Sequence, residues 1–359
     1  VRSDGVLACM TFRREEQVVA WHRHTLGGRF GACTVTVSDY ENIAVGTTLI
    51  FTKSNGEKVT FTSEAAGSSN PASATGFRPN TNNNTTADNI FTTINAHADF
   101  TVANPSAAVV TITETVHGSS GFLSCASSDI VRLTTADEGI AVVETVTTIP
   151  GDLDEDQVWF IVKRTINGST TRYIEYLSGF DFGNDVTNAF FVDCGLTYSG
   201  TAATSISGLN HLEGQTVSIL ADGAAHADKV VASGAITLDR SVTKAQIGLQ
   251  YSSKLETLRI DAGSAMGTSQ GKNKRIGEVT VRLYRSVGLK VGTSSTQLDT
   301  VNFRSSADKM DKALSLFSGD KTVEFNGGYD DDATITIVQD LPLPMTILAL
   351  FPTLSVFDK

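Results

Sequence analysis

The sequence predicts a mainly β protein in which a repeat architecture is interrupted by an inserted domain. The strand-like stretch Gln17–Thr25 (QVVAWHRHT) reappears in kind as Gln157–Thr165 (QVWFIVKRT), each following an acidic turn. A repeated strand separated by a long unrelated segment indicates a repeat fold with an insertion. Glycine (31) far outnumbers proline (7), and the abundant Thr, Ser and Val favour short strands joined by tight turns.

Composition limits the class of protein. A chain of 359 residues with 40% hydrophobic and 19% charged residues is globular and long enough for two or three domains. The net charge of −11 argues against a surface that grips nucleic-acid phosphates, which needs a basic footprint. The same charge fits a channel through which nucleic acid slides without sticking.

Three further features place the chain. No apolar run reaches the roughly 18–20 residues that span a bilayer, and Met345–Phe351 is predicted as a strand between prolines. The chain begins at Val1 within a strand-like pattern, so we expect it to be the later part of a longer polypeptide. The cysteines have no paired spacing and are expected to be small buried apolar residues: Cys9, Cys33, Cys125 and Cys194.

Residues 1–28 predict a hairpin of strands Val6–Phe12 and Val18–His24. The inserted domain, residues 29–138, is rich in Thr, Asn, Ser and Ala. Its predicted strands are Cys33–Val37, Thr48–Thr52, Lys58–Thr62, Val109–Thr113 and Ile130–Leu133. One helix is expected from the 3.6-residue spacing of apolar side chains between Ala87 and Ala98, with Thr86 as its cap, and Ser68–Thr86 is expected to be a long exposed loop.

The strand pattern of residues 1–28 resumes in residues 139–188. Ile140–Ile149, Val158–Arg164 and Arg172–Leu177 predict three strands, the last two joined by a two-residue turn at Asn167–Gly168. Residues 189–291 predict a small domain of short glycine-divided strands that ends in the long strand Ile276–Tyr284.

Residues 292–359 predict further scaffold strands with one short helix. The helix is expected over Asp308–Phe317, capped by Ser306, and the strands over Thr322–Phe325 and Thr334–Gln339.

Candidate chemistry is sparse, and no catalytic, cofactor-binding or metal-binding residue is assigned. His22 and His24 share a strand face but lack further ligands, and the acidic turns Asp152–Asp156 and Asp330–Asp332 lack the ligand spacing of calcium loops, so solvated charges are the preferred interpretation. Ser306 and Lys309 match an Ser-x-x-Lys spacing without its supporting motifs.

Two further groups have a structural interpretation. The basic cluster Gly271–Arg275 is interpreted as a solvated loop rather than a contact to phosphate or to a neighbouring subunit. Trp21, Trp159 and Phe160 are interpreted as core residues.

Several segments together resemble one family. They are Asp4–Phe12 leading to Val19–His24, Gln157–Gly168 with Arg172–Leu177, Phe191–Gly214, and the closing Pro342–Leu348. They are similar to the tail nozzle (tail tubular B-like, or stabilisation) proteins of short-tailed bacteriophages. The resemblance covers residues 1–28 and about 139–358; residues 29–138 depart from it.

The resemblance implies a partial β-propeller-like scaffold, with an inserted β-sandwich-like domain and a further C-terminal β-domain. It implies a virion protein of the phage tail that forms a homo-oligomeric ring, expected to be a hexamer, beside other tail proteins such as an adaptor and a fibre or spike. Double-stranded DNA would pass through the lumen without specific binding, and no enzymatic activity or cofactor is expected.

Two other functions stay open at this point. A host-surface or glycan-binding adhesin would use residues 29–138, including Ser68–Thr86, for recognition. A glycan-degrading enzyme would need two carboxylates in a cleft, which the sequence cannot place in space.

Overall fold

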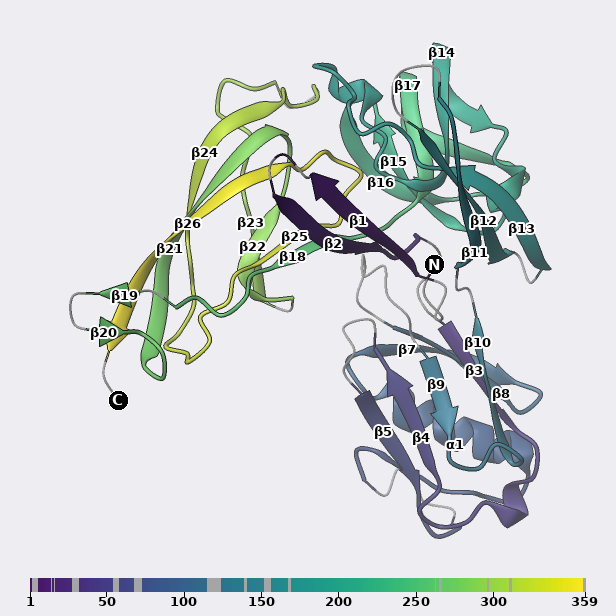
Figure 1. Cartoon of the computed structure of the whole chain (residues 1–359). Coiled ribbons are helices and arrows are strands. Elements are labelled where there is room, and N and C mark those ends of the chain that lie inside the picture. The colour runs from purple at the N-terminus through teal and green to yellow at the C-terminus, as the bar shows by residue number, and fades with distance from the viewer. Residues whose placement is uncertain are drawn as a thin grey trace. The chain divides into compact units, whose positions relative to one another are not determined.

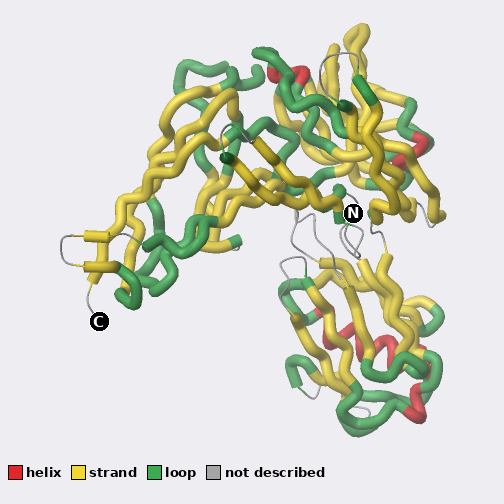
Figure 2. The backbone as a smooth tube through the Cα atoms, in the orientation of Figure 1, coloured by secondary structure: helices red, strands yellow, loops and turns green. Residues whose placement is uncertain are grey.

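The protein is mainly β (Figures 1 and 2). It divides into two compact units. Unit 1 comprises residues 1–177 and 213–215, and unit 2 comprises residues 178–212 and 216–359. The computed structural model describes the whole chain except residues 2–5, 14, 16, 28–31, 54–57, 68–72, 115–123, 139–140, 152–155, 167–168, 262, 265–266, 296, 310–311 and 358–359.

The two predicted copies of the opening strand are both strands of unit 1. They are β2 (Val18–His24) and β12 (Gln157–Ile166). The other strands of this part are β1 (Leu7–Arg13), β11 (Val142–Ile149) and β13 (Ser169–Tyr176). β1 and β2 form an antiparallel hairpin, and the other three strands form an antiparallel sheet in the order β11-β12-β13.

The hairpin and the sheet share one small core. Its members are Leu7, Cys9, Leu26, Ala141, Val143, Val158, Phe160 and Val162. The predicted turn at Asn167–Gly168 and residues 152–155 of the predicted acidic turn lie outside the described residues. Ile166 and Ser169, which flank residues 167–168, pair with each other.

Residues 32–138 form a module with two sheets and a helix. One sheet has the order β10-β3-β8-β7 and the other the order β6-β5-β4-β9. Its elements are β3 (Ala32–Val37), η1 (Tyr40–Asn42), β4 (Thr48–Thr52), β5 (Lys58–Ser63), β6 (Gly76–Phe77), α1 (Asn83–Asn95), β7 (Phe100–Ser106), β8 (Val109–Glu114), β9 (Ser124–Ser127) and β10 (Leu133–Glu138). We call residues 32–138 the inserted module.

Both sheets and α1 contribute to a single core in the inserted module. The apolar face of α1 (Ala87, Ile90 and Ile94) is buried, and the helix contacts β7, β8 and β3. Cys33 and Cys125 are buried in this core, as expected of small apolar side chains. The same prediction is wrong for Cys9 and Cys194, which are only half-buried.

Three predictions for this module are wrong in detail. Asn82, not Thr86, caps α1, because the Asn82 Oδ1 accepts the Thr85 N–H at 2.8 Å while Thr86 is buried one turn into the helix. The expected loop Ser68–Thr86 contains β6, which pairs in parallel with β5, and the start of α1. Ile130–Arg132 form a turn, and the strand begins only at Leu133.

Unit 2 begins with a four-stranded antiparallel sheet in the order β14-β17-β15-β16. Its elements are η2 (Val186–Asn188), β14 (Asp193–Ser207), η3 (Asn210–Leu212), β15 (Thr216–Ala221), β16 (Ala224–Val230) and β17 (Ala235–Leu249). β14 and β17 are 15 residues long, not short as predicted, because Gly200 lies within an irregular part of β14 and does not end it.

The rest of unit 2 is a pair of sheets with a common core. The sheets have the orders β18-β25-β22-β23 and β24-β21-β26, and a two-stranded ribbon, β19-β20, accompanies them. The strands are β18 (Ser253–Glu256), β19 (Gly263–Ser264), β20 (Gly267–Thr268), β21 (Asn273–Ser286), β22 (Lys290–Ser294), β23 (Gln297–Thr300), β24 (Phe317–Glu324), β25 (Thr336–Gln339) and β26 (Ile347–Phe357).

This arrangement corrects the predicted boundary after residue 291. β22 runs across that position and pairs with β23 and β25, so the strands before and after it belong to one sheet. The final strand also runs further than predicted, through Pro352 to Phe357, which is tolerated because β26 lies at the edge of its sheet.

The predicted helix over Asp308–Phe317 is wrong. The Asp308 carboxylate accepts the Ser305 N–H at 2.6 Å and so closes a tight turn. The Arg304 guanidinium donates to the carbonyl oxygens of Lys309 and Lys312, and Phe317 already belongs to β24. Within this stretch the structure describes residues 306–309 and 312–317, and none of them is helical.

Candidate interaction surface

The hairpin β1–β2 is packed at its base and exposed beyond it. At the base, Leu7 and Leu26 are buried in the core shared with β12, and Cys9 packs against it. Every residue of β2 from Val18 to Arg23 is exposed, although the strand alternates between two faces. We call the exposed part of the hairpin, residues 10–12 and 18–23, the hairpin arm.

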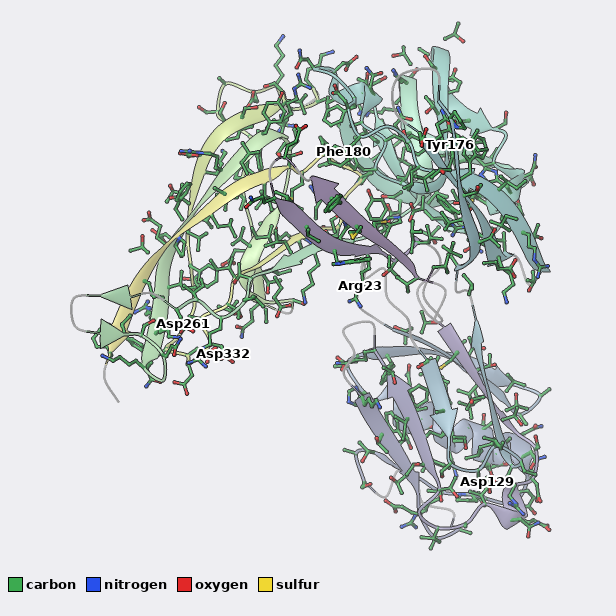
Figure 3. The ribbon with its side chains drawn as sticks, in the orientation of Figure 1. Arg23, Asp129, Tyr176, Phe180, Asp261 and Asp332 are labelled. Atoms are coloured by element: carbon green, nitrogen blue, oxygen red, sulfur yellow. The ribbon has the colours of Figure 1, made fainter. Side chains whose placement is uncertain are left out.

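One face of the hairpin arm carries large apolar side chains. The strand register places Met10 opposite Trp21 and Phe12 opposite Val19, all on the same face. Trp21 is 69% exposed and Phe12 is 60% exposed. Arg23 follows on this face, opposite Ala8 (Figure 3). The prediction that Trp21 is a core residue is therefore wrong, because no neighbouring strand of the described chain covers this face.

A second apolar face lies on the sheet β11-β12-β13. The face opposite the core carries Trp159, which pairs with Tyr176, and Ile161, which pairs with Ile174. The ring centroids of Trp159 and Tyr176 (the latter labelled in Figure 3) are 5.0 Å apart. Tyr176 is 55% exposed and Ile174 is 73% exposed. We call Trp159, Ile174 and Tyr176 the outer sheet face. Of the three residues predicted as core, only Phe160 is fully buried.

A buried ion pair fixes the base of the hairpin to this sheet. The Arg164 guanidinium, 3% exposed, donates to both carboxylate oxygens of Glu175, at 2.8 and 3.1 Å. It also donates to the carbonyl oxygen of Gly27, just after β2, at 2.6 Å. A bidentate, charge-assisted pair of this kind holds its partners in one geometry, so the hairpin leaves the core in a defined direction.

The residues considered for metal binding do not come together. His22 and His24 share a face as predicted, and they pair with Cys9 and Leu7 of β1. In the part of the chain that the structure describes, no group of three or more His, Cys, Asp or Glu side chains is placed to hold a metal ion.

The basic cluster and the acidic turn near the C-terminus are parts of one structure. Lys274 is fully buried at the start of β21, so its interpretation as part of a solvated loop is wrong. Its ammonium donates to Asp261 Oδ1 at 2.8 Å and to the Asp331 carbonyl at 3.0 Å (Asp261 is labelled in Figure 3).

The surroundings of this lysine explain its burial. Its backbone exchanges hydrogen bonds with Asp330, and Arg259 lies 3.7 Å from Asp332, also labelled in Figure 3. The hydrogen bond from Lys274 holds the pKa of Asp261 below its usual range. Two basic residues therefore contact the acidic turn Asp330–Asp332: Lys274 donates to its backbone, and Arg259 lies beside the Asp332 carboxylate.

Unit 2 also has a small open hollow next to the connector after β13. The hollow, about 90 Å³, is lined mainly by apolar groups, including Phe180, Phe191 and Leu343. Burial, with a contribution from the Asp193 charge, raises the pKa of the Tyr251 phenol on its wall, so this hydroxyl stays neutral. Phe180 is exposed at the rim (Figure 3). Tyr251, Ser253 and Gln339 are the polar residues of this otherwise apolar lining.

Sequence reasoning located the strands that carry both apolar surfaces but not their exposure. The signal was present in part, since Met10, Phe12, Val19 and Trp21 alternate with polar or small residues on an isolated hairpin. No matching family model and no matching curated protein was found for this chain. No helix of the described residues is long and apolar enough to cross a membrane.

Proposed function

We propose that the chain is a structural component of a short bacteriophage tail that assembles into a ring through its hairpin arm and outer sheet face. The ring would be a hexamer that retains the genome and conducts double-stranded DNA during ejection. The scaffold strands would form part of a propeller-like body. The sequence resemblance of residues 1–28 and about 139–358 to tail nozzle proteins supports this family.

The observation that carries the proposal is the exposed apolar hairpin arm. A two-stranded hairpin alone is marginally stable in water, yet this one presents Trp21, Phe12, Met10 and Val19 to solvent. A second copy of the chain that covers this face would remove large aromatic and aliphatic side chains from water, at roughly 25 cal/mol per Å² of apolar area.

The presence of two different apolar surfaces favours a ring over a two-fold dimer. The hairpin arm and the outer sheet face lie on separate sheets of unit 1 and have different shapes and residues. A contact between two different patches is heterologous, and repeating it closes a ring when the rotation allows. The net charge of −11 also fits a lumen through which DNA slides without binding to the wall.

The test is assembly of the full chain in solution. Sedimentation velocity and negative-stain images of the purified protein should show closed rings, and Trp21→Lys or Ile174→Lys should return it to monomers. Val230→Lys is the matched control, because Val230 is also an exposed apolar strand residue, on β16 of unit 2. A monomeric wild-type protein, or rings that survive both substitutions, would contradict the assembly surfaces.

The virion role needs its own experiment. Phage particles assembled without this protein should lose their DNA or lack complete tails. Particles that keep their genome and build complete tails without it would refute the role even if the purified chain forms rings.

A further inference from the structure

The inserted module has two ends that differ in character. The chain enters it at Ala32 and leaves it at Glu138, and these residues pair with each other at one end of the sheet. At the other end of the same pair of strands, Val37 is opposite Leu133. The loops at residues 38–47 and 128–132 therefore lie at the end away from the scaffold connections, which we call the module tip.

Exposed apolar side chains of the inserted module gather at its tip. Val45, Ile130 and Val131 are 70%, 72% and 71% exposed. They are the only exposed large hydrophobic residues among those that the structure describes between 32 and 138. Scattered single apolar residues on a surface are ordinary, but a concentration of them at one end of the module marks an interaction site.

Hydrogen bonds within the turn at residues 129–133 hold this part of the module tip in one conformation. The Asp129 carboxylate accepts the N–H groups of Val131 and Arg132, both at 3.3 Å, and the Leu133 N–H donates to the Asp129 carbonyl at 2.9 Å. Asp129 lies at this end of the module in Figure 3. A side chain that binds its own turn in this way fixes the turn and presents Ile130 and Val131 outward.

Hydrogen bonds also join the separate loops of the tip. The Ser38 N–H donates to the Arg132 carbonyl at 2.9 Å, and Thr48 and Ser128 exchange two hydrogen bonds. Asn83, at the start of α1, accepts the Tyr40 N–H at 2.9 Å. Rigid presentation lowers the entropy that a binding surface loses on association, so this geometry suits docking.

The charge around the apolar residues is mainly negative. Asp39 and Glu41 are on the loop beside the turn, and Asp129 is within it. Burial acts to raise the pKa of Asp129, but hydrogen bonds from Arg132 bring it below its usual value, so the carboxyl is charged at neutral pH. Arg132 contacts Asp129 at 3.1 Å and Asp39 at 3.8 Å and is the single cation set against these three carboxylates in the described loops 38–47 and 128–132.

This charge selects between possible occupants. Two tips facing each other would bring like charges together, which disfavours a second copy. An anionic lipid surface would be repelled for the same reason. The tip carries aliphatic side chains, whereas sugar recognition favours aromatic platforms. A protein surface with an apolar socket bordered by Lys or Arg satisfies both the apolar residues and the carboxylates.

We propose that the module tip is a docking site for such a partner protein, with Val45, Ile130 and Val131 as apolar anchors and Asp39 and Glu41 as the polar rim. Three side chains do not supply the roughly 800 Å² that one partner buries in a standard interface, so they act as anchors within a wider contact. The proposal does not depend on ring assembly by the scaffold.

The test uses a display library of random 12-residue peptides, selected against the full-length protein. The tip variant Val45→Ser, Ile130→Ser, Val131→Ser should keep the wild-type melting profile, because all three side chains are in solvent. The matched control is Val230→Ser, Leu258→Ser, Leu348→Ser, which removes three exposed apolar side chains from unit 2.

Selected peptides should combine an apolar segment with flanking Lys or Arg. They should bind the tip variant at least tenfold more weakly than the wild type and the control variant. Glu41→Gln should weaken these peptides about twofold to fivefold and reduce the salt dependence of binding.

Four results would overturn the proposal. They are no tip-dependent peptides, tip-dependent peptides rich in Asp or Glu, binding of the wild type but not the tip variant to vesicles containing phosphatidylglycerol, and self-association in sedimentation that the tip variant abolishes.

Discussion

The ion pair between Arg164 and Glu175 is expected to control the stability of the hairpin and the sheet together. Arg164→Met removes the guanidinium while keeping a similar apolar stem, and it leaves the Glu175 carboxylate, 13% exposed, without its cation. It also removes a donor from the Gly27 carbonyl. Breaking one side of a buried pair costs about 3–5 kcal/mol, so the free energy of unfolding of this part should fall by about that amount.

The two tryptophans make this loss directly measurable. Trp21 is in β2 and Trp159 is in β12, and the chain has no other tryptophan. Urea unfolding followed by tryptophan fluorescence therefore reports on the two elements that Arg164 joins, without a signal from the inserted module or unit 2. The midpoint should shift to lower urea, with the loss given by the slope times the shift.

A double variant separates the pair from simple packing. Arg164→Met with Glu175→Leu removes both charges, so the carboxylate is no longer stranded and the loss should be clearly smaller than that of Arg164→Met alone. A loss below about 1 kcal/mol for Arg164→Met, or an equal loss in the double variant, would show that the pair does not hold the hairpin to the sheet.

Three further substitutions test other parts of the fold. Asp261→Asn should destabilise the start of β21 more than Lys274→Met does, because it removes the counter-charge of a fully buried ammonium, whereas Lys274→Met leaves a carboxylate that water can reach and should cost about 1.5–3 kcal/mol. Hydrogen exchange of β21 amides measures both losses, and the reverse order would contradict the argument. Ala107→Asn should stabilise the β7–β8 hairpin by about 0.5–1 kcal/mol, because Ala107 and Ala108 have φ of +50° and +63° in a two-residue turn that favours Asn and Gly. Hydrogen exchange of the β8 amides should become slower, and unchanged exchange would count against the prediction. Burial acts to raise the pKa of Asp222, but the N–H groups of Lys244 and Thr243 lower it below its usual value. The Asp222 contribution to folding stability is therefore present above about pH 4 and is lost as the pH falls through the folded pKa. Asp222→Asn should lose that pH dependence in thermal scans between pH 3 and pH 7, and an unchanged profile would be inconsistent with it.

Local pattern was enough to predict most of the strands and α1, the one α-helix of the described residues. Alternation located β1, β2 and β12, and 3.6-residue spacing located α1, because those signals depend on neighbours in the sequence. The wrong predictions depend on a side chain that competes with the backbone. Asp129 turns a β-branched stretch into a loop, and Arg304 takes carbonyls of the segment that was expected to be helical.

Exposure was harder to predict than secondary structure, because it depends on which strands lie next to each other. Trp159 and Trp21 occupy similar strand sequences, yet β12 has a neighbour on each side and β2 has one. The module tip was missed for a related reason. Ile130 and Val131 have the composition of a strand, and only the turn geometry shows that they face solvent.

The two copies of the opening strand differ in the way that an uncovered arm requires. Where β12 places Phe160 and Val162 toward the core, β2 has Ala20 and His22 at the matching positions. These are small or polar residues that tolerate water, so this face of the hairpin arm needs no cover. The opposite face keeps Trp21 and its apolar neighbours, which water does not favour. A strand adapted to solvent on one side and left apolar on the other is best explained by a partner that covers the apolar side, and the proposed ring supplies that partner as the next copy of the chain.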